Sequence, residues 1–344
     1  MKSIKVALIA SFIAIQAFSV DAEACTRVIY EGADERFITA RSMDWKVEIP
    51  SALWVFPKGM KRDGGIDENS IKWTSKYGSI VTAGYDVATD DGMNEMGLVA
   101  NLLYLVESDY GKSNNKTISI AALTQYVLDN FATVTEAVVS LKKPPHLQVV
   151  APSMPGGEKA SLHLAISDAS GDSAVIEFVK GEMVIHHSKE YKTMTNSPVY
   201  DKQLAIGSYW AKIDGMQMLP GTYSASDRFA RASFYTNKIA PAKSEKEAVA
   251  TAFSIIRNAS VPMGISSPSE PNIASTLWRT VSDQKRLRYY FDSATSPSVF
   301  WVDISKLDLK VGAKVKKLDL IGYPTYSGET STHFKDAKPF KWLK

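Results

Sequence analysis

Cysteine is nearly absent from this chain, which limits how the fold can be stabilised. Cys25 is the only cysteine among 344 residues, so no disulfide can form within the chain. An excess of one charge is absent as well, because 40 Lys and Arg against 37 Asp and Glu leave a net charge of +3. A balance so close to neutral argues against a phosphate-binding surface, and we expect no nucleic-acid partner.

Long apolar runs are missing after Ala24. A membrane-spanning helix needs about 20 consecutive apolar residues. No later segment of the chain reaches that length without charged residues. We therefore expect no stable insertion in a membrane.

Sequence patterns that bind metals or cofactors are missing too. The chain has five histidines, and only His186 and His187 are neighbours. Adjacent residues of a strand point to opposite faces, so this pair does not suggest a zinc site. No glycine-rich nucleotide-binding fingerprint is present. Nothing around Cys25 matches the sequence that surrounds the catalytic cysteine of papain-like proteases, so we do not expect a protease of that class. We expect neither a metal nor a cofactor.

The N-terminal segment has the layout of a secretory signal peptide. Lys2 and Lys5 give it a positive start, residues 6–20 are uncharged and mostly apolar, and Ala22-Glu23-Ala24 matches an A-x-A cleavage site. We expect residues 1–24 to be removed from an exported protein that is periplasmic or secreted. The remainder, residues 25–344, is expected to form a single domain.

Cleavage after Ala24 would make Cys25 the first residue of the mature chain. Free thiols titrate near about 8.5 and α-amines near about 7.7–8.0, so the amine of such a residue can take the thiol proton. The amine can later return that proton to a leaving amine. An alternative is a lipoprotein signal, with Cys25 acylated in a periplasmic binding lipoprotein. Ala22 stands where such signals usually carry leucine.

A hairpin is expected directly after the cysteine. Its strands cover residues 26–31 and 36–42, and the simplest register places Arg41 opposite Thr26. Asp44 then lies just beyond the second strand. A reactive thiol needs a cation that favours the thiolate, and its amine needs a carboxylate that holds it. Arg41 and Asp44 are therefore candidates for these two tasks.

Strands and helices are expected to occur in blocks along the chain, which favours a layered α+β fold. Residues 49–76 are expected to form a loop, because prolines and glycines interrupt them. Ser244 and Glu247 predict a capping box. Alternation typical of strands is found at 79–84, 97–105, 161–167, 174–180, 183–187, 192–195, 277–282, 286–292 and 298–303, and helical periodicity at 119–131, 134–141, 225–239 and 244–258.

Six short motifs resemble, in order, the choloylglycine hydrolase and penicillin V acylase family. The resemblance spans residues 25 to about 303, and it begins on the cysteine of the predicted cleavage site. It implies the four-layer αββα sandwich of the N-terminal-nucleophile hydrolases, which agrees with the block pattern. The motifs are Cys25-Thr26-Arg27, Ala40–Trp45, Asp91–Leu98, Thr195–Pro198, Leu219–Gly221 and Ser226–Phe229.

The resemblance implies roles for individual residues. Cys25 is similar to the family nucleophile, Arg41 to the arginine beside the thiol, and Asp44 to the aspartate that binds the amine. Asn196 is similar to the asparagine whose side chain helps to form the oxyanion hole. The second oxyanion donor is expected to be the backbone N–H of Tyr104.

An arginine is implied to complete the polar network, and two positions are open for it. Arg228 matches the motif, but Arg231 is close enough in sequence to be the residue concerned.

The implied reaction is hydrolysis of a small-molecule acyl amide. Tyr104 stands where penicillin V acylases carry Tyr and bile-salt hydrolases usually carry Asn, which favours removal of the phenoxyacetyl group from penicillin V. Conjugated bile salts and N-acyl homoserine lactones are the alternative substrates. Trp45, together with the loop around Trp54 and Phe56, is expected to form an aromatic acyl pocket. The resemblance also implies a homotetramer.

Overall fold

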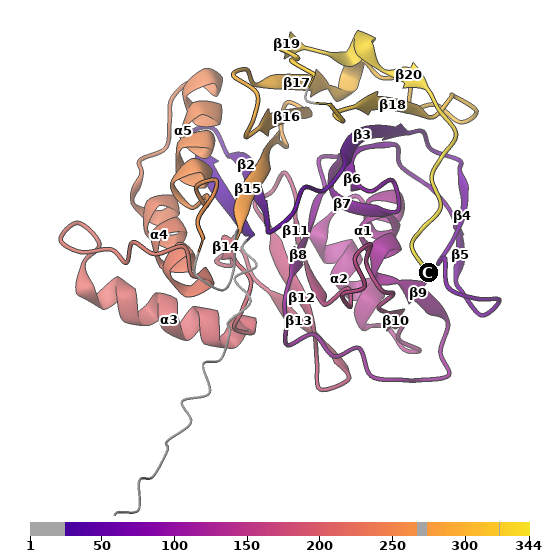
Figure 1. The fold of residues 1–344 in the computed structure, drawn as a ribbon, viewed down its shortest axis with the longest axis horizontal. Coiled ribbons are helices and arrows are strands. Elements are labelled where there is room, and N and C mark those ends of the chain that lie inside the picture. The colour runs from indigo at the N-terminus through magenta and orange to yellow at the C-terminus, as the bar shows by residue number, and fades with distance from the viewer. Residues whose placement is uncertain (1–24, 267–273, 323) are drawn as a thin grey trace, which may run out of the picture.

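Two β-sheets packed face to face form the centre of the protein, and helices cover both outer faces (Figure 1). The computed structural model describes residues 25–266, 274–322 and 324–344. The predicted signal peptide, residues 1–24, lies outside the described residues. Among the residues described, no helix has the length and apolar character needed to cross a membrane. The predicted four-layer αββα architecture is confirmed.

The first sheet has seven strands and contains the start of the described chain. Every neighbouring pair is antiparallel except the last, which is parallel. The order is β14 (Thr193–Met194), β1 (Thr26–Gly32), β2 (Arg36–Trp45), β15 (Ser275–Asp283), β16 (Arg288–Ser293), β17 (Phe300–Asp303) and β19 (Gly328–Glu329).

The second sheet has nine strands, all antiparallel to their neighbours. Two small ribbons lie outside it, formed by β4 (Lys61–Asp63) with β5 (Lys72–Thr74) and by β9 (Thr117–Ser119) with β10 (Gln148–Val150). The order of the large sheet is β13 (Glu182–His187), β12 (Ser173–Val179), β11 (Leu162–Ser167), β8 (Val99–Tyr104), β7 (Ala88–Asn94), β6 (Ser79–Gly84), β3 (Ser51–Phe56), β18 (Lys316–Asp319) and β20 (Lys335–Asp336).

Five α-helices form the outer layers of the described chain. α1 (Ile120–Asn130) and α2 (Val134–Lys142) pack on the nine-stranded sheet. α4 (Ala225–Lys238) and α5 (Glu245–Asn258) pack on the seven-stranded sheet, and α3 (Tyr200–Ile213) packs against α4. A Ser or Thr side chain caps the start of α1, α2, α4 and α5, whereas α3 has no side-chain cap. The capping box of Ser244 and Glu247 is present at the start of α5.

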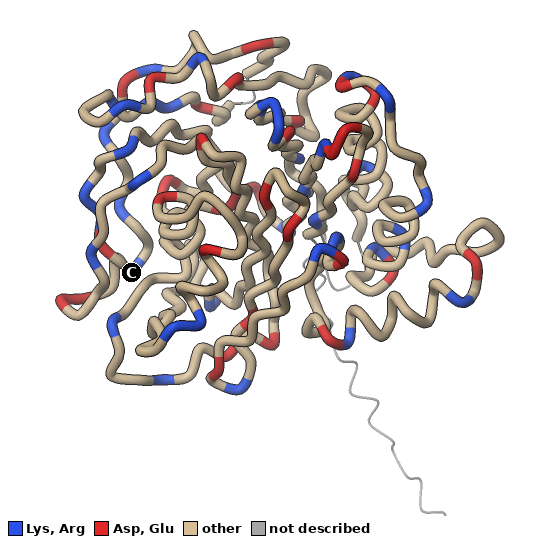
Figure 2. The backbone as a smooth tube through the Cα atoms, turned by 180° about the vertical axis from the view of Figure 1, so that it is seen from behind, with Lys and Arg blue, Asp and Glu red and all other residues tan. Residues whose placement is uncertain are grey.

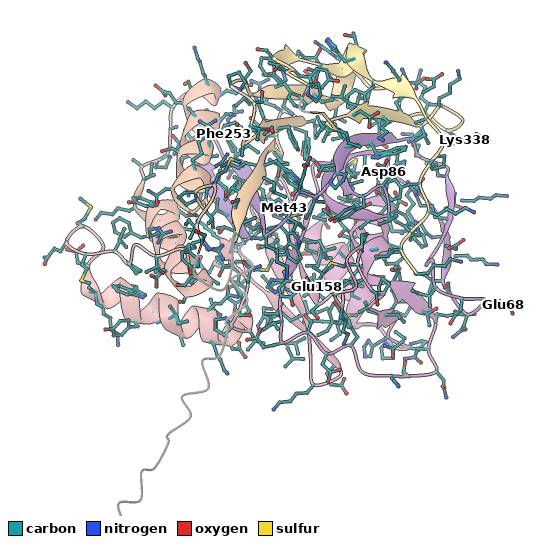
Figure 3. The ribbon with its side chains drawn as sticks, viewed as in Figure 1. Met43, Glu68, Asp86, Glu158, Phe253 and Lys338 are labelled. Atoms are coloured by element: carbon teal, nitrogen blue, oxygen red, sulfur yellow. The ribbon has the colours of Figure 1, made fainter. Side chains whose placement is uncertain are left out.

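Three apolar cores separate the four layers. The central core joins the two sheets, with Leu53 and Val99 of one sheet against Tyr289 and Phe300 of the other. The outer cores join each sheet to its helices. Met43 lies near the middle of the molecule, whereas Phe253 of α5 lies on the helical side of the seven-stranded sheet (Figure 3). Neither charge sign collects on one side of the backbone (Figure 2).

The predicted loop at residues 49–76 is wrong. It contains β3, a fully buried strand paired with β6 and β18, as well as the short strands β4 and β5. Both faces of β3 are covered, so its residues show no apolar–polar alternation that would mark a strand. Pro50 and Pro57 bound this strand instead of interrupting it.

The hairpin register is shifted by one residue from the predicted one. Arg27 pairs with Arg41 and Gly32 with Arg36, which leaves three residues in the turn. Asp34 and Glu35 in that turn have φ of 57° and 52°, a left-handed conformation that the simpler register did not include. A shift of one residue exchanges the two faces of a strand.

Candidate active site

Cys25 lies immediately before β1, with its sulfur in the core between the two sheets. The side chain is 2% exposed and is not in a disulfide. Its Sγ lies 3.9 Å from Sδ of Met43 and 3.8 Å from the backbone oxygen of Asp44. The hairpin register explains this position: Thr26 pairs with Ser42, so Cys25, which precedes Thr26, lies beside Met43, which follows Ser42.

Arg41 shares the face of β2 on which Met43 lies, two residues apart. Its Nη2 is 3.9 Å from Cys25 Sγ and donates a hydrogen bond of 2.9 Å to the backbone oxygen of Leu102 on β8. The guanidinium carbon lies 4.5 Å from the ring centre of Trp278. Burial raises the pKa of the Cys25 thiol, and the nearby Arg41 charge is the strongest effect in the opposite direction.

Asp44 occupies the opposite face of β2, towards the helices. Its carboxylate accepts hydrogen bonds from Ser42 Oγ at 3.0 Å and from Oγ1 of Thr276, which lies opposite it on β15. Burial raises the pKa of Asp44 to about 6, while the Arg228 charge and the two hydroxyls lower it. The backbone of Asp44 contacts the thiol, but its carboxylate lies on the other side of the strand.

Arg228 of α4 is the arginine that the structure brings to this site. It is fully buried, and its Nη1 donates to the backbone oxygen of Cys25 and to Thr26 Oγ1, each at 2.6 Å. Its Nη1 is also 4.0 Å from the Asp44 carboxylate. Arg231 lies one turn further along the helix, and it donates instead to the backbone oxygens of residues 220 and 222. The geometry therefore selects Arg228 over Arg231.

Asn196 follows β14 and connects three parts of the site. Its Oδ1 accepts from the backbone nitrogen of Cys25 at 2.5 Å and from Nη2 of Arg228 at 2.9 Å. Its Nδ2 donates to the backbone oxygen of Tyr104 at 2.8 Å. Because Ala24 precedes Cys25 in this chain, the Cys25 nitrogen here is a peptide N–H.

Tyr104 ends β8 on the side of the pocket where Asn196 lies. Leu105 N donates a hydrogen bond to Ser161 O at 2.9 Å, so Leu105 and Ser161 form a hydrogen-bonded pair. Because such pairs alternate along antiparallel strands, Tyr104 and Leu162 form a non-hydrogen-bonded pair. The backbone N–H of Tyr104 therefore points away from β11. An extended residue directs its N–H and C=O to the same side, and Asn196 binds the C=O of Tyr104. The two expected oxyanion donors thus face the same region.

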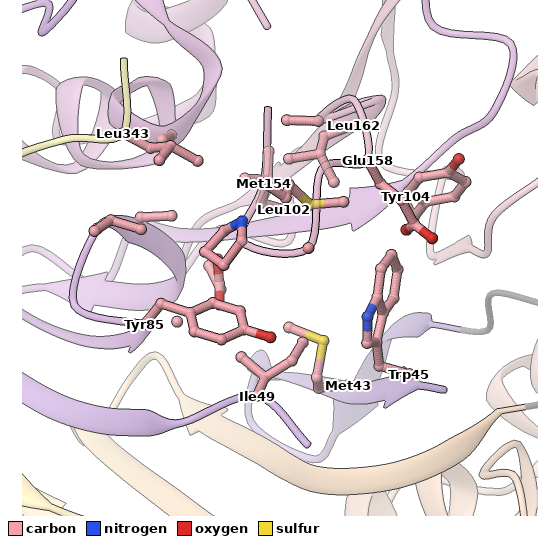
Figure 4. A pocket seen from close by; sticks show the side chains of 18 of the residues that line it. Met43, Trp45, Ile49, Tyr85, Leu102, Tyr104, Met154, Glu158, Leu162 and Leu343 are labelled. Carbon is pink, nitrogen blue, oxygen red and sulfur yellow. The ribbon is translucent and has the colours of Figure 1, made fainter. Parts of the chain in front are cut away.

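A pocket of about 270 Å³ opens beside the thiol. Trp45 and Tyr104 lie on one side of it, with ring centres 5.6 Å apart in an edge-to-face arrangement, and Tyr85 and Leu343 lie across from them (Figure 4). Most of the other lining side chains are apolar and come from several separate segments, for example Met43, Ile49, Leu102, Ile120, Met154 and Leu162.

Trp54 and Phe56 are not part of this pocket, contrary to expectation. Both side chains are buried in the outer core of the nine-stranded sheet, at 4% and 1% exposure. Their rings stack on each other at 5.8 Å and contact Phe340 of the C-terminal segment. They belong to a strand whose alternate residues face the helices, so their side chains stabilise the fold and do not reach the acyl pocket.

Sequence reasoning missed several residues that shape the site. Thr276 contacts the Asp44 carboxylate, and Met43 contacts the Cys25 sulfur. Met154 and Glu158 reach the pocket from the loop after β10. A single sequence carries no signal for these contacts, because they depend on which strands become neighbours. No group of metal-ligating side chains was found among the described residues.

The arrangement of these groups suits nucleophilic attack on an acyl carbon. A buried thiol has a cation beside it, two donors facing one region and an apolar pocket for an acyl group. The sequence profile of the linear amide C–N hydrolases, choloylglycine hydrolase family, matches residues 25–322. The chain belongs to this family. It is therefore an amidohydrolase that acts on linear amides.

Relatives of known name agree with this membership. A penicillin V acylase from Pectobacterium atrosepticum is 49% identical over 358 residues, covering 96% of this chain and 95% of the relative. The solved structure of penicillin V acylase from Agrobacterium tumefaciens has a TM-score of 0.86 and 55% identity, covering 93% of this chain and 99% of that one.

A more distant structure supports the fold. A mutant of conjugated bile acid hydrolase from Clostridium perfringens superposes with a TM-score of 0.75 at 21% identity, covering 88% of this chain and 98% of that one. Likeness at this level concerns the fold alone.

Proposed function

We propose that this amidohydrolase removes the phenoxyacetyl side chain from penicillin V and leaves the β-lactam ring closed. The observation that carries the proposal is the aromatic pocket beside the thiol, where Trp45 and Tyr104 meet edge to face. Aromatic walls bind a planar aryl group by ring packing. The names of two relatives, 49% and 55% identical to this chain, also support this substrate.

The proposed mechanism begins once Cys25 is the first residue. Its α-amine takes the thiol proton, and the sulfur attacks the amide carbon to form a tetrahedral oxyanion. The side-chain N–H of Asn196 and the backbone N–H of Tyr104 stabilise this oxyanion. The C–N bond then breaks, the α-amine returns its proton to the leaving nitrogen, and an acyl thioester remains on Cys25. Water hydrolyses the thioester, releasing the carboxylic acid and restoring the thiol.

The charged residues have supporting tasks in this mechanism. Arg41, with Nη2 at 3.9 Å from the sulfur, stabilises the thiolate. Asp44, on the other face of β2, stabilises the protonated amine at the chain terminus. Arg228 holds the backbone of Cys25 and the side-chain oxygen of Asn196 in one network. This network fixes the nucleophile relative to its oxyanion donors.

Export and maturation form part of the proposal. We infer that the signal segment is removed after Ala24 and that the enzyme is periplasmic or secreted. The family match that begins at residue 25 supports this boundary. Mass spectrometry of the mature N-terminus tests it: a free amine on Cys25 is expected, and a diacylglyceryl thioether would support the lipoprotein alternative. Assembly as a homotetramer is proposed from the family resemblance, and sedimentation velocity of the mature protein tests it.

A substrate panel on the purified mature enzyme tests the proposed activity. We expect penicillin V to be hydrolysed with a higher kcat/KM than glycocholate, because a steroid packs less specifically against the two aromatic rings. An N-acyl homoserine lactone completes the panel. Equal or faster hydrolysis of glycocholate would overturn the choice of substrate, while the amidase chemistry would stand.

A further inference from the structure

One carboxyl group in the pocket wall has neither a hydrogen-bond partner among the described residues nor a role in the proposed mechanism. Four charged side chains line the pocket, and three of them have partners: Lys46 pairs with Glu158, and Arg41 binds the backbone of β8. The fourth, Asp90, is partly buried in β7. No residue in the described part of the chain donates a hydrogen bond to its carboxylate, and only nearby charges and burial act on it.

The strand geometry at Asp90 is irregular. On β6, Thr82 pairs with Asp91 and Ala83 pairs with Thr89, so Asp90 is the extra residue of a β-bulge. The pairing of β7 with β8 also ends at Asp91, opposite Asn101. Bulges near functional sites redirect a side chain. Here the bulge places a carboxyl on the wall of the pocket, where β7 and β8 separate.

Gly84 provides the space that this carboxyl occupies. A Cβ atom built on Gly84 would lie 2.5 Å from Oδ2 of Asp90, well inside van der Waals contact. The backbone of Gly84 has no positive φ to account for the glycine. A glycine stands at this position because the Asp90 carboxyl occupies the space of a side chain. The backbone conformation of Gly84 does not itself require a glycine.

The neighbouring residue shows how a structural carboxyl in this fold is satisfied. Asp91 accepts hydrogen bonds from Tyr289 Oη at 2.5 Å and from Asn101 Nδ2 at 2.6 Å. Asp90 has no equivalent partners in the described chain, and burial raises its pKa to about 7, with Arg41 lowering it and Asp91 raising it. A carboxyl group in apolar surroundings costs free energy until a donor binds it. Once an acyl group fills the pocket and displaces solvent from this wall, a donor on the acyl group can bind the carboxyl.

We propose that Asp90 is a specificity-determining residue that favours acyl groups bearing a hydroxyl over the same acyl groups without one. This inference rests on the proposed acyl-amide hydrolysis and deepens it. A site built to bind a hydroxyl discriminates against an analogue that lacks it, because its own polar group is then left without a partner in the complex. The remaining apolar wall makes no such distinction.

The test compares phenoxyacetyl amides with their 3-hydroxy and 4-hydroxyphenoxyacetyl counterparts, all carrying one common leaving amine. In the wild-type mature enzyme, at least one hydroxylated amide should have a kcat/KM about tenfold above that of the unsubstituted amide. Asp90→Ala should bring this ratio to about one, largely by raising kcat/KM for the unsubstituted amide. Asp90→Asn retains an acceptor oxygen and should retain part of the preference.

Control variants separate a local effect from a change in net charge. Glu68→Gln removes a carboxylate at an exposed loop far from the pocket and should leave the ratio unchanged (Figure 3). Gly84→Ala keeps Asp90 but displaces its carboxyl, so the ratio should fall as in Asp90→Ala. Thermal unfolding of each variant shows whether the protein is folded.

Binding to the inactive Cys25→Ala protein, measured by calorimetry, gives a result independent of turnover. Tighter binding of a hydroxylated amide, lost in Cys25→Ala with Asp90→Ala, supports the role of Asp90 even if a different amide is the true substrate. A wild-type ratio near one in both turnover and binding overturns it. Failure of the wild-type enzyme to cleave any phenoxyacetyl amide contradicts the proposed substrate and leaves the binding comparison decisive for Asp90.

Discussion

The carboxyl of Asp44 is subject to opposing effects within a few ångströms. Burial raises its pKa to about 6, and the Arg228 charge, Thr276 and Ser42 hold it below the value that burial alone would give. In the proposed mechanism this carboxyl acts as the anion. Activity should therefore fall as pH decreases through the pKa of Asp44.

Thr276→Val tests this balance while preserving side-chain shape. Loss of the hydroxyl removes a hydrogen bond to the carboxylate, so the pKa of Asp44 rises. The acidic limb of the kcat/KM profile should move to higher pH by about one unit. The control Thr124→Val removes a buried hydroxyl in α1 that has no hydrogen-bond partner in the described structure. An unchanged acidic limb in Thr276→Val would exclude Asp44 as the group that titrates there.

Two tryptophans of similar burial should differ in what their replacement damages: catalytic efficiency for one and fold stability for the other. Trp45 lines the pocket and contacts Tyr104, whereas Trp54 packs in the outer core against Phe56 and Phe340. Trp45→Ala should lower kcat/KM for penicillin V at least about tenfold, since an aromatic contact and its apolar area are lost. Trp54→Ala should destabilise the fold by about 3–5 kcal/mol.

Chemical denaturation and steady-state kinetics on both variants make the comparison. The folded fraction of Trp54→Ala should retain a kcat/KM close to that of the wild type. If Trp54→Ala lowers kcat/KM in the folded protein as much as Trp45→Ala does, then the pocket extends further into the core than the structure indicates.

At the scale of secondary-structure elements, the sequence predicts those elements whose pattern is local. The span of β6 is predicted to the residue, and α1, α2, α4 and α5 within one or two residues, because caps and periodicity are properties of neighbouring residues. β3 escapes prediction because both of its faces are buried. α3 escapes it as well, and its N-cap residue makes no side-chain hydrogen bond. The hairpin register depends on a left-handed turn conformation.

Helix α4 carries two arginines three residues apart with different surroundings. Arg228 is fully buried and contacts Cys25, Thr26 and Asn196, while Arg231 binds loop carbonyls near the surface. Arg228→Lys retains the charge but loses the planar fork that bonds several oxygens at once. We expect kcat/KM to fall about 100-fold, the scale seen when oxyanion positioning is lost.

Arg231→Lys is the matched control on the same helix, and it should change kcat/KM by less than about threefold because its contacts stay outside the site. Melting temperatures of both variants separate misfolding from misplacement of Asn196. Similar losses in the two folded variants would contradict the choice of Arg228 as the site arginine.

The site as a whole brings together residues that are far apart in the chain. Cys25 and Asn196 are 171 residues apart, and Arg228 lies 203 residues after Cys25, yet all three share hydrogen bonds. Local patterns indicate the nucleophile and the two candidate residues on β2. The distant members are predicted only from the family resemblance. Thr276 and the pocket segments depend on sheet order, which no local pattern encodes.

Maturation is expected to activate a site that is already assembled. In the structure, the peptide N–H of Cys25 donates to Asn196 Oδ1, and Arg228 binds the Cys25 carbonyl, although a residue precedes Cys25 in the chain. The polar network therefore does not require a free amine. Folding and catalysis should separate experimentally at this one bond.

An alanine inserted before Cys25 in the mature protein tests that separation. The extended protein should unfold at the same temperature as the mature enzyme, because the contacts of Cys25 and Asn196 form with a peptide nitrogen. Turnover should be abolished, since a peptide nitrogen cannot take the thiol proton. Removal of the added alanine by an aminopeptidase should restore kcat to the mature level. Normal turnover by the extended protein would show that the thiol is deprotonated by a base other than the α-amine of Cys25 itself.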